Sequence, residues 1–289
     1  MLIGPDMATT TTTTTTNELA GFTRSILLYG CGTMAGAMLA RWVACGLPAS
    51  AVTALRKSGA QVDGAHATIS TSQGQTPPDL LIIGIKPQLF PALSADIAGL
   101  IGPGTLVISM MAGITLDGLA AALPTASSII RIMPNMPVAT GRGVVAAIAR
   151  GASAGQLADW AALCAPLGHA HSLTDEGEFD LVTALTGCGP AFVYRFIAAI
   201  SGAAVRLGLD ADSADQLARA TVAGAAASAA ESTTTPAAMA TAVASPGGMT
   251  QAGLDVLDSD GRLATLMAET LRAARDRGRE LGLAARKDG

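Results

Sequence analysis

Short apolar runs alternate with amphipathic segments over residues 25–174. The runs are bounded by glycine or proline and are apolar throughout, which is typical of strands buried on both faces of a parallel sheet. They predict strands near residues 25–30, 51–55, 66–71, 79–85, 105–109, 128–133, 143–149 and 168–173. The segments between them predict helices near residues 35–45, 87–100, 115–123 and 154–165. This alternation predicts an α/β domain of the Rossmann type over residues 25–174.

The pattern changes at Asp175, where strand-like runs stop and helical segments rich in small residues take over. They predict helices near residues 175–186, 191–207, 214–230 and 261–282, with a break at 187–190. The last of these carries an apolar stripe opposite arginine and glutamate, formed by Leu263, Leu266, Met267 and Leu271. Flat, alanine-rich faces let helices approach closely. Residues 175–289 therefore predict an all-α domain or an interlocked interface between subunits.

The first 24 residues differ from the rest of the chain. They contain an unbroken threonine run from Thr9 to Thr16, and such low-complexity sequence has little to bury. They also lack the basic start and long apolar core of a secretory signal. Residues 1–24 are therefore predicted to be a disordered head.

Composition narrows the classes of function. The chain has 289 residues, of which 50% are hydrophobic, but alanine and glycine supply much of that share. Because no charge-free apolar run reaches about 18 residues, a membrane span is not expected. The net charge of −4 and the scattered lysines and arginines argue against a nucleic-acid surface.

Cysteines and histidines give no sign of a metal site. The four cysteines lie far apart without a C-x-x-C pair, which indicates a reduced, cytosolic protein without structural zinc. Of the three histidines, His169 and His171 alternate as on the exposed face of a short strand.

The strongest chemical signal is Gly30-Cys-Gly-Thr-Met-Ala35, which follows the first strand and opens the first helix. This is the G-x-G-x-x-G/A dinucleotide fingerprint in its required context. Gly30 permits the tight turn, and Gly32 lets the backbone approach a pyrophosphate. The small side chain of Ala35 allows close packing of helix on strand.

The second strand leads directly into Arg56, Lys57 and Ser58. An NAD-preferring domain would carry an acidic residue about here for the ribose hydroxyls. Two basic residues and a hydroxyl suit a 2′-phosphate instead, which favours NADPH over NADH. The alternative is an ordinary solvated basic turn.

Unusual residues also follow other strands, as in Lys86-Pro-Gln88, Met110-Met-Ala-Gly113 and Pro134-Asn-Met-Pro137. In an open α/β sheet the carboxyl ends of the strands are where ligands bind. Lys86 is a candidate general acid, but beside a proline at a strand end it is more simply a partner in a salt bridge.

The helical domain contains its own candidate site, Val243-Ala-Ser-Pro-Gly-Gly-Met-Thr250. Ser245 is predicted to be a helix N-cap, followed by Pro246 in the first turn. Gly247 and Gly248 leave the backbone bare, so that a carboxylate can reach the N–H groups of a helix N-terminus. The alternative is a plain Pro-Gly turn between two helices.

Taken together and in this order, these motifs resemble those of the pyrroline-5-carboxylate reductase family, from Ser25 to the C-terminal helix. The motifs that carry the likeness are Gly30-Cys-Gly-Thr-Met-Ala35, Ile85-Lys-Pro-Gln88, Met133-Pro-Asn-Met-Pro137, Leu185-Thr-Gly-Cys-Gly-Pro-Ala191 and Ser245-Pro-Gly-Gly-Met-Thr250.

The resemblance implies a Rossmann-type domain and an all-helical dimerisation domain, a two-domain plan like that of 6-phosphogluconate dehydrogenase. It implies dimers with interlocked helical domains, often built into larger rings such as decamers. It also implies NAD(P)H-dependent reduction of the cyclic imine 1-pyrroline-5-carboxylate to L-proline, the last step of proline synthesis.

The resemblance also assigns roles to residues of this chain. The pyrophosphate would be held by Gly30, Cys31, Gly32, Thr33 and Met34, and the 2′-phosphate by Arg56, Lys57 and Ser58. The nicotinamide would be bordered by Ile85, Lys86, Pro87, Ala112, Gly113 and Asn135. The substrate carboxylate and ring nitrogen would be held by Ser245, Gly247, Gly248, Met249 and Thr250, across the subunit interface from the partner's cofactor.

The predicted chemistry needs no histidine or acid pair. A protonated cyclic iminium already accepts hydride readily, so the enzyme has mainly to orient it and exclude water. Thr250 is predicted to hydrogen-bond the ring nitrogen and to supply or relay the proton. The alternative is a first-turn residue that satisfies backbone groups.

Three other functions compete with this one. A 3-hydroxyacid dehydrogenase typically has a lysine general acid in its second domain, but this chain has no lysine between Lys86 and Lys287. A reductase of a six-membered cyclic imine such as piperideine carboxylate would share every motif. A non-catalytic NADP(H)-binding sensor would not need the carboxylate-binding stretch from Ser245 to Thr250.

Overall fold

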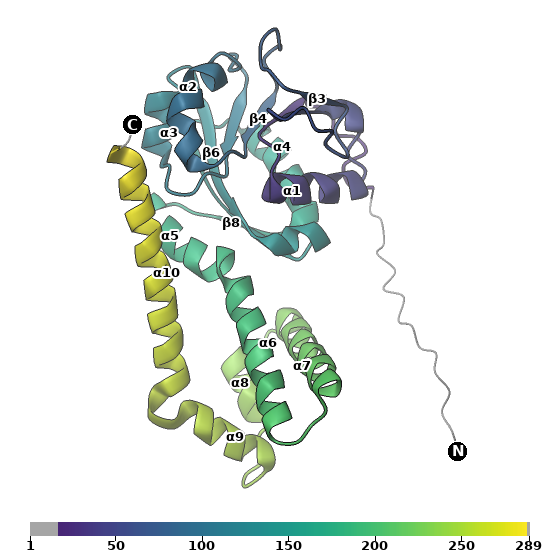
Figure 1. Cartoon of the computed structure of the whole chain (residues 1–289), viewed down its shortest axis with the longest axis vertical. Coiled ribbons are helices and arrows are strands. Elements are labelled where there is room, and N and C mark those ends of the chain that lie inside the picture. Colours follow the sequence, from purple (N-terminus) through teal and green to yellow (C-terminus); the bar gives the residue numbers. More distant parts are fainter. Residues whose placement is uncertain (1–16, 288–289) are drawn as a thin grey trace, which may run out of the picture. The chain divides into compact units, whose positions relative to one another are not determined.

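The computed structural model of the chain describes residues 17–287 (Figure 1). The chain forms two compact units, one that ends at Thr174 and one that spans Asp175–Lys287.

The first unit contains an eight-stranded sheet with the order β3-β2-β1-β4-β5-β6-β7-β8. Every neighbouring pair is parallel except β6 and β7. The strands are β1 (Ile26–Tyr29), β2 (Val52–Leu55), β3 (Ala67–Ile69), β4 (Leu80–Ile83), β5 (Leu106–Ser109), β6 (Ser128–Pro134), β7 (Gly143–Arg150) and β8 (Gly168–Ser172). All eight predicted strands are confirmed.

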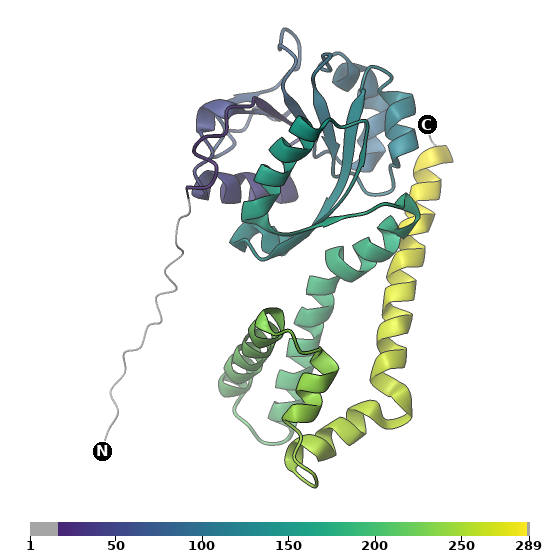
Figure 2. The same ribbon diagram turned by 180° about the vertical axis from the view of Figure 1, so that it is seen from behind.

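Helices cover both faces of this sheet, α2 and α3 on one face and α1 and α4 on the other (Figures 1 and 2). They are α1 (Thr33–Ala44), α2 (Phe90–Ala98), α3 (Leu116–Ala122) and α4 (Ala154–Cys164). Short 3₁₀ turns connect the elements at Ala49–Ala51, Pro87–Leu89, Met136–Thr140 and Ala165–Leu167. The predicted Rossmann-type fold and its four helices are confirmed.

Burial on both faces explains why the central strands are apolar at every position. Ile26 and Leu28 of β1 pack in one core with residues of α1 and α4, while every residue of β1 is buried. Trp42 joins α1 to α4 within this core, because its indole N–H donates a 2.7 Å hydrogen bond to the carbonyl of Leu163.

The prediction of a disordered head over residues 1–24 is wrong for residues 17–24. Leu19 is buried in the core, and its N–H donates to the carbonyl of Cys45 at 2.9 Å. Phe22 packs against the same core. These two apolar side chains, close behind the threonine run, have enough surface to hold the segment in place. Residues 1–16 lie outside the described part of the chain.

The regular elements of the second unit are all helices. Its α-helices are α5 (Phe179–Val182), α6 (Gly189–Arg206), α7 (Ala211–Glu231), α8 (Pro236–Ala242), α9 (Met249–Asp258) and α10 (Arg262–Lys287). A π-helical turn at Thr183–Gly187 and 3₁₀ turns at Glu176–Glu178 and Ser259–Gly261 complete it.

The predicted break at residues 187–190 is wrong, because the chain stays helical there. Thr183–Gly187 form a π turn, in which the N–H of Cys188 bonds to the carbonyl of Thr183 at 3.1 Å. Pro190 lies in the first turn of α6, where its missing N–H costs nothing. The π turn therefore shifts the helical register, and Pro190 follows it without ending the helix.

The helices of the second unit leave much apolar surface uncovered. In α7 only Ala214 and Ala218 are buried. The exposed large apolar side chains of α6 and α10 include Val193, Tyr194, Phe196, Ile200, Leu263, Leu266 and Met267. Soluble domains seldom expose so many without a partner to cover them.

Candidate functional site

The predicted cofactor residues of the first unit gather at one edge of its sheet. Tyr29, the last residue of β1, is in register with Leu55 of β2 and Ile83 of β4. The segments that follow these parallel strands therefore meet at their carboxyl ends. The chain order reverses between β1 and β4, since β2 lies on one side of β1 and β4 on the other. Ligands of open α/β sheets bind at such a point.

The two glycines of the fingerprint have different surroundings. Gly30 has a φ of 87°, and a Cβ there would lie 2.7 Å from Cγ2 of Ile85. The fold itself therefore requires glycine at this position. Gly32 is the N-cap of α1, and a Cβ there would meet no heavy atom within 4 Å. Its bare backbone leaves open space at the N-terminus of α1, a helix of 12 residues. Such a helix N-terminus suits the approach of a pyrophosphate.

Gly84, directly after β4, is a site residue that the sequence analysis missed. A Cβ on Gly84 would lie 2.6 Å from the carbonyl oxygen of Gly30 and 3.3 Å from Cβ of Ala35. The fingerprint loop therefore rests on a second glycine from the neighbouring strand. The available signal was a glycine inside an apolar run, which often marks close approach of another backbone.

The basic turn after β2 lies next to the fingerprint loop. The side chains of Arg56, Lys57 and Ser58 are all exposed. The N–H of Arg56 donates to the carbonyl of Ile69 at 2.8 Å, which ties the turn to the end of β3. Burial raises the pKa of the Cys31 thiol, and the positive charge of Arg56 opposes that rise. Cys31 is thus neutral, and Arg56 lies close enough to act on it.

The segments after β4, β5 and β6 provide the residues expected around the nicotinamide. Lys86 is exposed and forms no ion pair with the residues that the structure describes, and Ala112 is exposed in a turn. Ile85, Pro87 and Gly113 are half-buried.

Asn135 follows β6 and is buried. Its side-chain carbonyl accepts a 2.8 Å hydrogen bond from the N–H of Val144 on β7. This bond closes the β6–β7 connection, so Asn135 has a clear structural role at the same edge of the sheet.

The stretch expected to bind the substrate lies in the second unit. The prediction that Ser245 is the N-cap is wrong: the cap is Gly248, and α9 begins at Met249. Gly247 has a φ of 70°, which no helix tolerates, and the N–H of Gly248 donates to the carbonyl of Ser245 at 2.9 Å. Residues 245–248 therefore form a turn that leads into the helix. The stretch thus contains both features weighed from the sequence, a Pro-Gly turn and a helix N-terminus.

The N-terminus of α9 is open. No side chain caps it, and Met249 is 94% exposed. Thr250, one residue later, is exposed as well. Exposed N–H groups and a hydroxyl therefore lie side by side in the first turn of a ten-residue helix. Such an arrangement can bind a carboxylate and a hydrogen-bonding group next to it.

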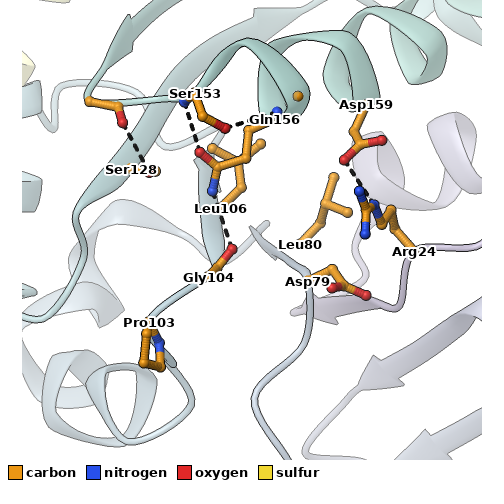
Figure 3. A pocket seen from close by; sticks show the side chains of 12 residues that line it. Arg24, Asp79, Leu80, Pro103, Gly104, Leu106, Ser128, Ser153, Gln156 and Asp159 are labelled. Carbon is orange, nitrogen blue, oxygen red and sulfur yellow. Dashed lines mark hydrogen bonds and ion pairs between the residues drawn. The ribbon is translucent and has the colours of Figure 1, made fainter.

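The cavity of about 500 Å³ in the first unit lies elsewhere, near the starts of β4, β5 and β6 (Figure 3). Its polar groups bond to one another. Arg24 pairs with Asp159 at 3.0 Å, and Gln156 donates to the carbonyl of Gly104 at 3.2 Å. It contains none of the predicted site residues and lies at the amino ends of the strands, so we do not assign it to the site.

Metal ligands are absent from the described residues, where no group of three or more His, Cys, Asp or Glu is placed to hold an ion. His169 and His171 are both exposed on β8, with ring centroids 6.3 Å apart, which confirms their expected place on a strand face.

Comparison with known proteins decides the family. The model of pyrroline-5-carboxylate reductase dimerisation matches residues 176–281. Over 266 residues the chain is 31% identical to the pyrroline-5-carboxylate reductase of Pseudomonas aeruginosa, covering 90% of this chain and 97% of that protein. The chain belongs to the pyrroline-5-carboxylate reductase family. It is also 31% identical to pyrroline-5-carboxylate reductase 3 of Macaca fascicularis, covering 90% of this chain and 96% of that protein.

Solved structures of pyrroline-5-carboxylate reductases have the same fold. The structure from Coxiella burnetii has a TM-score of 0.82 at 27% identity, covering 90% of this chain and 98% of that one. The structure from Plasmodium falciparum, with NADP bound, has a TM-score of 0.79 at 22% identity, with the same coverage. The resemblance read from the motifs and the two-part fold are thus confirmed.

Family membership also gives a reason for the apolar surface of the second unit. Among the described residues, one helical stretch, Glu176–Arg206, is long and apolar enough to cross a membrane by length and composition alone. The dimerisation model matches these same residues. The uncovered side chains of α6 therefore lie within the segment that the dimerisation model covers.

The open space at Gly32 gives a direct test of the cofactor edge. We expect Gly32→Ala to fold normally but to weaken NADPH binding by at least about tenfold, because the added methyl group occupies the closest approach of the pyrophosphate. Titration of the protein with NADPH, followed by fluorescence, measures this change.

Gly36→Ala is the matched control, since a Cβ there also meets nothing within 4 Å and lies one turn further along α1. It should keep NADPH affinity and stabilise the helix by about 1 kcal/mol. Equal affinity in both variants would contradict the assignment of Gly32.

Proposed function

We propose that this chain reduces 1-pyrroline-5-carboxylate to L-proline with NADPH or NADH as the hydride donor. The observation that carries the proposal is the match over nearly the whole length to the Pseudomonas aeruginosa enzyme. The open N-termini of α1 and α9 support it, because the reaction needs one anion site for a dinucleotide and another for a carboxylate.

The first unit fits a nicotinamide dinucleotide. The backbone from Gly30 to Met34 would hold the pyrophosphate at the start of α1. Arg56, Lys57 and Ser58 would hold the 2′-phosphate, since all three are exposed beside the loop. When bound, the reduced nicotinamide supplies a hydride. Ile85, Lys86, Pro87, Ala112, Gly113 and Asn135 would surround that ring at the carboxyl edge.

The second unit fits the other reactant. The carboxylate of the cyclic imine would bind along the turn at Gly247, Gly248 and Met249, beside the Ser245 hydroxyl. It would accept hydrogen bonds from the N–H groups of Gly247 and Met249, since that of Gly248 bonds to the Ser245 carbonyl. Thr250 would hydrogen-bond the ring nitrogen and relay a proton to it from water, so that the Thr250 hydroxyl is restored. The C=N carbon gains the hydride and the nitrogen keeps one proton, so the product is a cyclic secondary amine. Positioning, rather than strong acid–base catalysis, supplies the rate.

Self-association completes the proposal. We infer a homodimer through the second units, and we propose that such dimers assemble into larger rings such as decamers. Contact with nucleic acid or a membrane forms no part of the proposed function. The cysteines are unpaired in the described residues, and we propose a cytosolic site of action.

The activity test compares three substrates in one assay. NADPH oxidation is followed optically with 1-pyrroline-5-carboxylate, with piperideine carboxylate and with the 3-oxoacid that corresponds to a 3-hydroxyacid. We expect fast turnover with the five-membered imine alone. Preference for the six-membered imine would change the substrate but keep the mechanism. NADPH binding without turnover on any of the three would indicate a sensor and contradict the proposal.

Thr250 is tested by removing and then restoring its hydroxyl. We expect Thr250→Ala to lower kcat by about 100-fold, because proton transfer by a positioned group is worth about that much. Thr250→Ser should recover most of the activity. Thr270→Ala is the control, since the Thr270 hydroxyl bonds only to the Leu266 carbonyl within α10. Unchanged turnover in Thr250→Ala would exclude Thr250 from the proton transfer.

Cofactor preference depends on the basic turn. We expect Arg56→Ala to raise the KM for NADPH by about tenfold and to leave the KM for NADH nearly unchanged, because only NADPH carries the 2′-phosphate. Arg150→Ala is the control, since this arginine pairs with Asp117 at 2.6 Å on the protein surface. If both cofactors lose affinity equally, Arg56 does not read the phosphate.

A further inference from the structure

One carboxylate in the first unit joins three elements that are far apart in the sequence. Asp96, on α2, accepts a hydrogen bond from the Tyr29 hydroxyl at Oδ2 and another from the Ser72 hydroxyl at Oδ1. Tyr29 ends β1, and Ser72 lies in the connection from β3 to β4. We call these three residues the Asp96 network.

The two hydroxyls belong to buried residues that water reaches poorly, whereas the Asp96 carboxylate can also bond to water. Tyr29 is 2% exposed and Ser72 is 8% exposed, whereas Asp96 is exposed to solvent. Burial, reinforced by the hydrogen bond and charge of Asp96, raises the pKa of Tyr29 well above its usual range. Tyr29 therefore remains a donor at neutral pH. Hydrogen bonds to an ionised acceptor are stronger than those between neutral groups.

Both ends of the Asp96 network adjoin the cofactor edge. Tyr29 directly precedes Gly30, and its carbonyl accepts the N–H of Gly84 at 3.0 Å. Ser72 comes three residues after Ile69, whose carbonyl accepts the N–H of Arg56. The network thus connects the start of the fingerprint loop to the segment beside the basic turn.

The segment that carries Ser72 is fixed at its far end, where Asp79 bonds to Ser25 and the Pro78 carbonyl to Thr105, but its first half has little else to fix it. Residues 70–79 contain no helix or strand. The hydrogen bonds of Thr71 with Gln73 and of Ser72 with Gln75 stay within the segment. The bond from Ser72 to Asp96 is the contact that ties its first half to α2, and through α2 to β1.

We propose that the Asp96 network is a positioning device that holds residues 70–72 against the adenosine end of the cofactor. Tyr29, Ser72 and Asp96 are positioning residues, because none of them reaches the reacting atoms. The network sets the affinity for the dinucleotide and leaves the hydride step unchanged. This inference rests on the proposed function in requiring NADPH as the ligand.

The test removes one hydrogen bond at a time in the full-length protein. Tyr29→Phe keeps the aromatic ring, and Ser72→Ala removes only a hydroxyl. We expect each to raise the KM for NADPH by about three- to tenfold, the range that corresponds to losing one ordinary hydrogen bond, with kcat unchanged at saturation. Ser94→Ala, in the same helix as Asp96, is the control, because its hydroxyl bonds only to the carbonyl of Pro91.

Two further measurements distinguish a positioning role from a general loss of stability. The affinity for 2′,5′-ADP, a probe of the adenosine end alone, should fall by the same factor as the affinity for NADPH. In an Asp96→Ala background, Ser72→Ala should have no further effect, because both substitutions break the same contact. A purely structural role would lower thermal stability and kcat together and would leave the affinity for 2′,5′-ADP unchanged.

The outcomes are distinguishable. Unchanged KM for NADPH and unchanged 2′,5′-ADP affinity in Ser72→Ala and Asp96→Ala would overturn the inference. Loss of kcat with KM intact would overturn it as well. If Tyr29→Phe fails to fold, Ser72→Ala decides the matter, since Ser72 lies outside the strands and helices. A wild-type protein that binds no NADPH would instead refute the proposed function.

Discussion

The structure depends on the close approach of two backbones at the carboxyl ends of β1 and β4. A side chain on Gly84 would strike the carbonyl of Gly30, and a side chain on Gly30 would strike Ile85. Because both positions are bare, the fingerprint loop lies directly on the neighbouring strand, and α1 starts at the point where the chain order reverses. The open space at Gly32 then faces away from the protein, where a ligand can reach it.

The two units differ in how much apolar surface they bury, and this difference matches the roles proposed for them. The first unit has a full core, so it can hold a loop and a basic turn in fixed positions. The second unit buries little of its own apolar surface, and the site proposed for it is a helix N-terminus that no side chain caps. In the proposed dimer, covering that surface with a second subunit would also remove water from around the imine, which favours hydride transfer over competing reactions.

The sequence predicts the first unit well because doubly buried strands are uniformly apolar and their turns carry glycine or proline. It predicts less where the outcome depends on tertiary contacts. Leu19 orders the end of the head only because α1 offers it a surface, and Pro190 continues a helix only because a π turn precedes it. Gly247 moves the start of α9 beyond Ser245 through its left-handed backbone, which a capping rule does not foresee.

No local sequence pattern predicts the Asp96 network, since Tyr29 and Ser72 lie 67 and 24 positions from Asp96 along the chain. Its effect also differs in kind from that of the glycines. Backbone contact at Gly30 and Gly84 fixes the pyrophosphate loop rigidly, and any side chain there disrupts it. The network acts through single hydroxyls on an exposed carboxylate, where water can take over as partner. Substitution there therefore tunes how firmly the adenosine end is held, while the loop beneath the pyrophosphate keeps its shape.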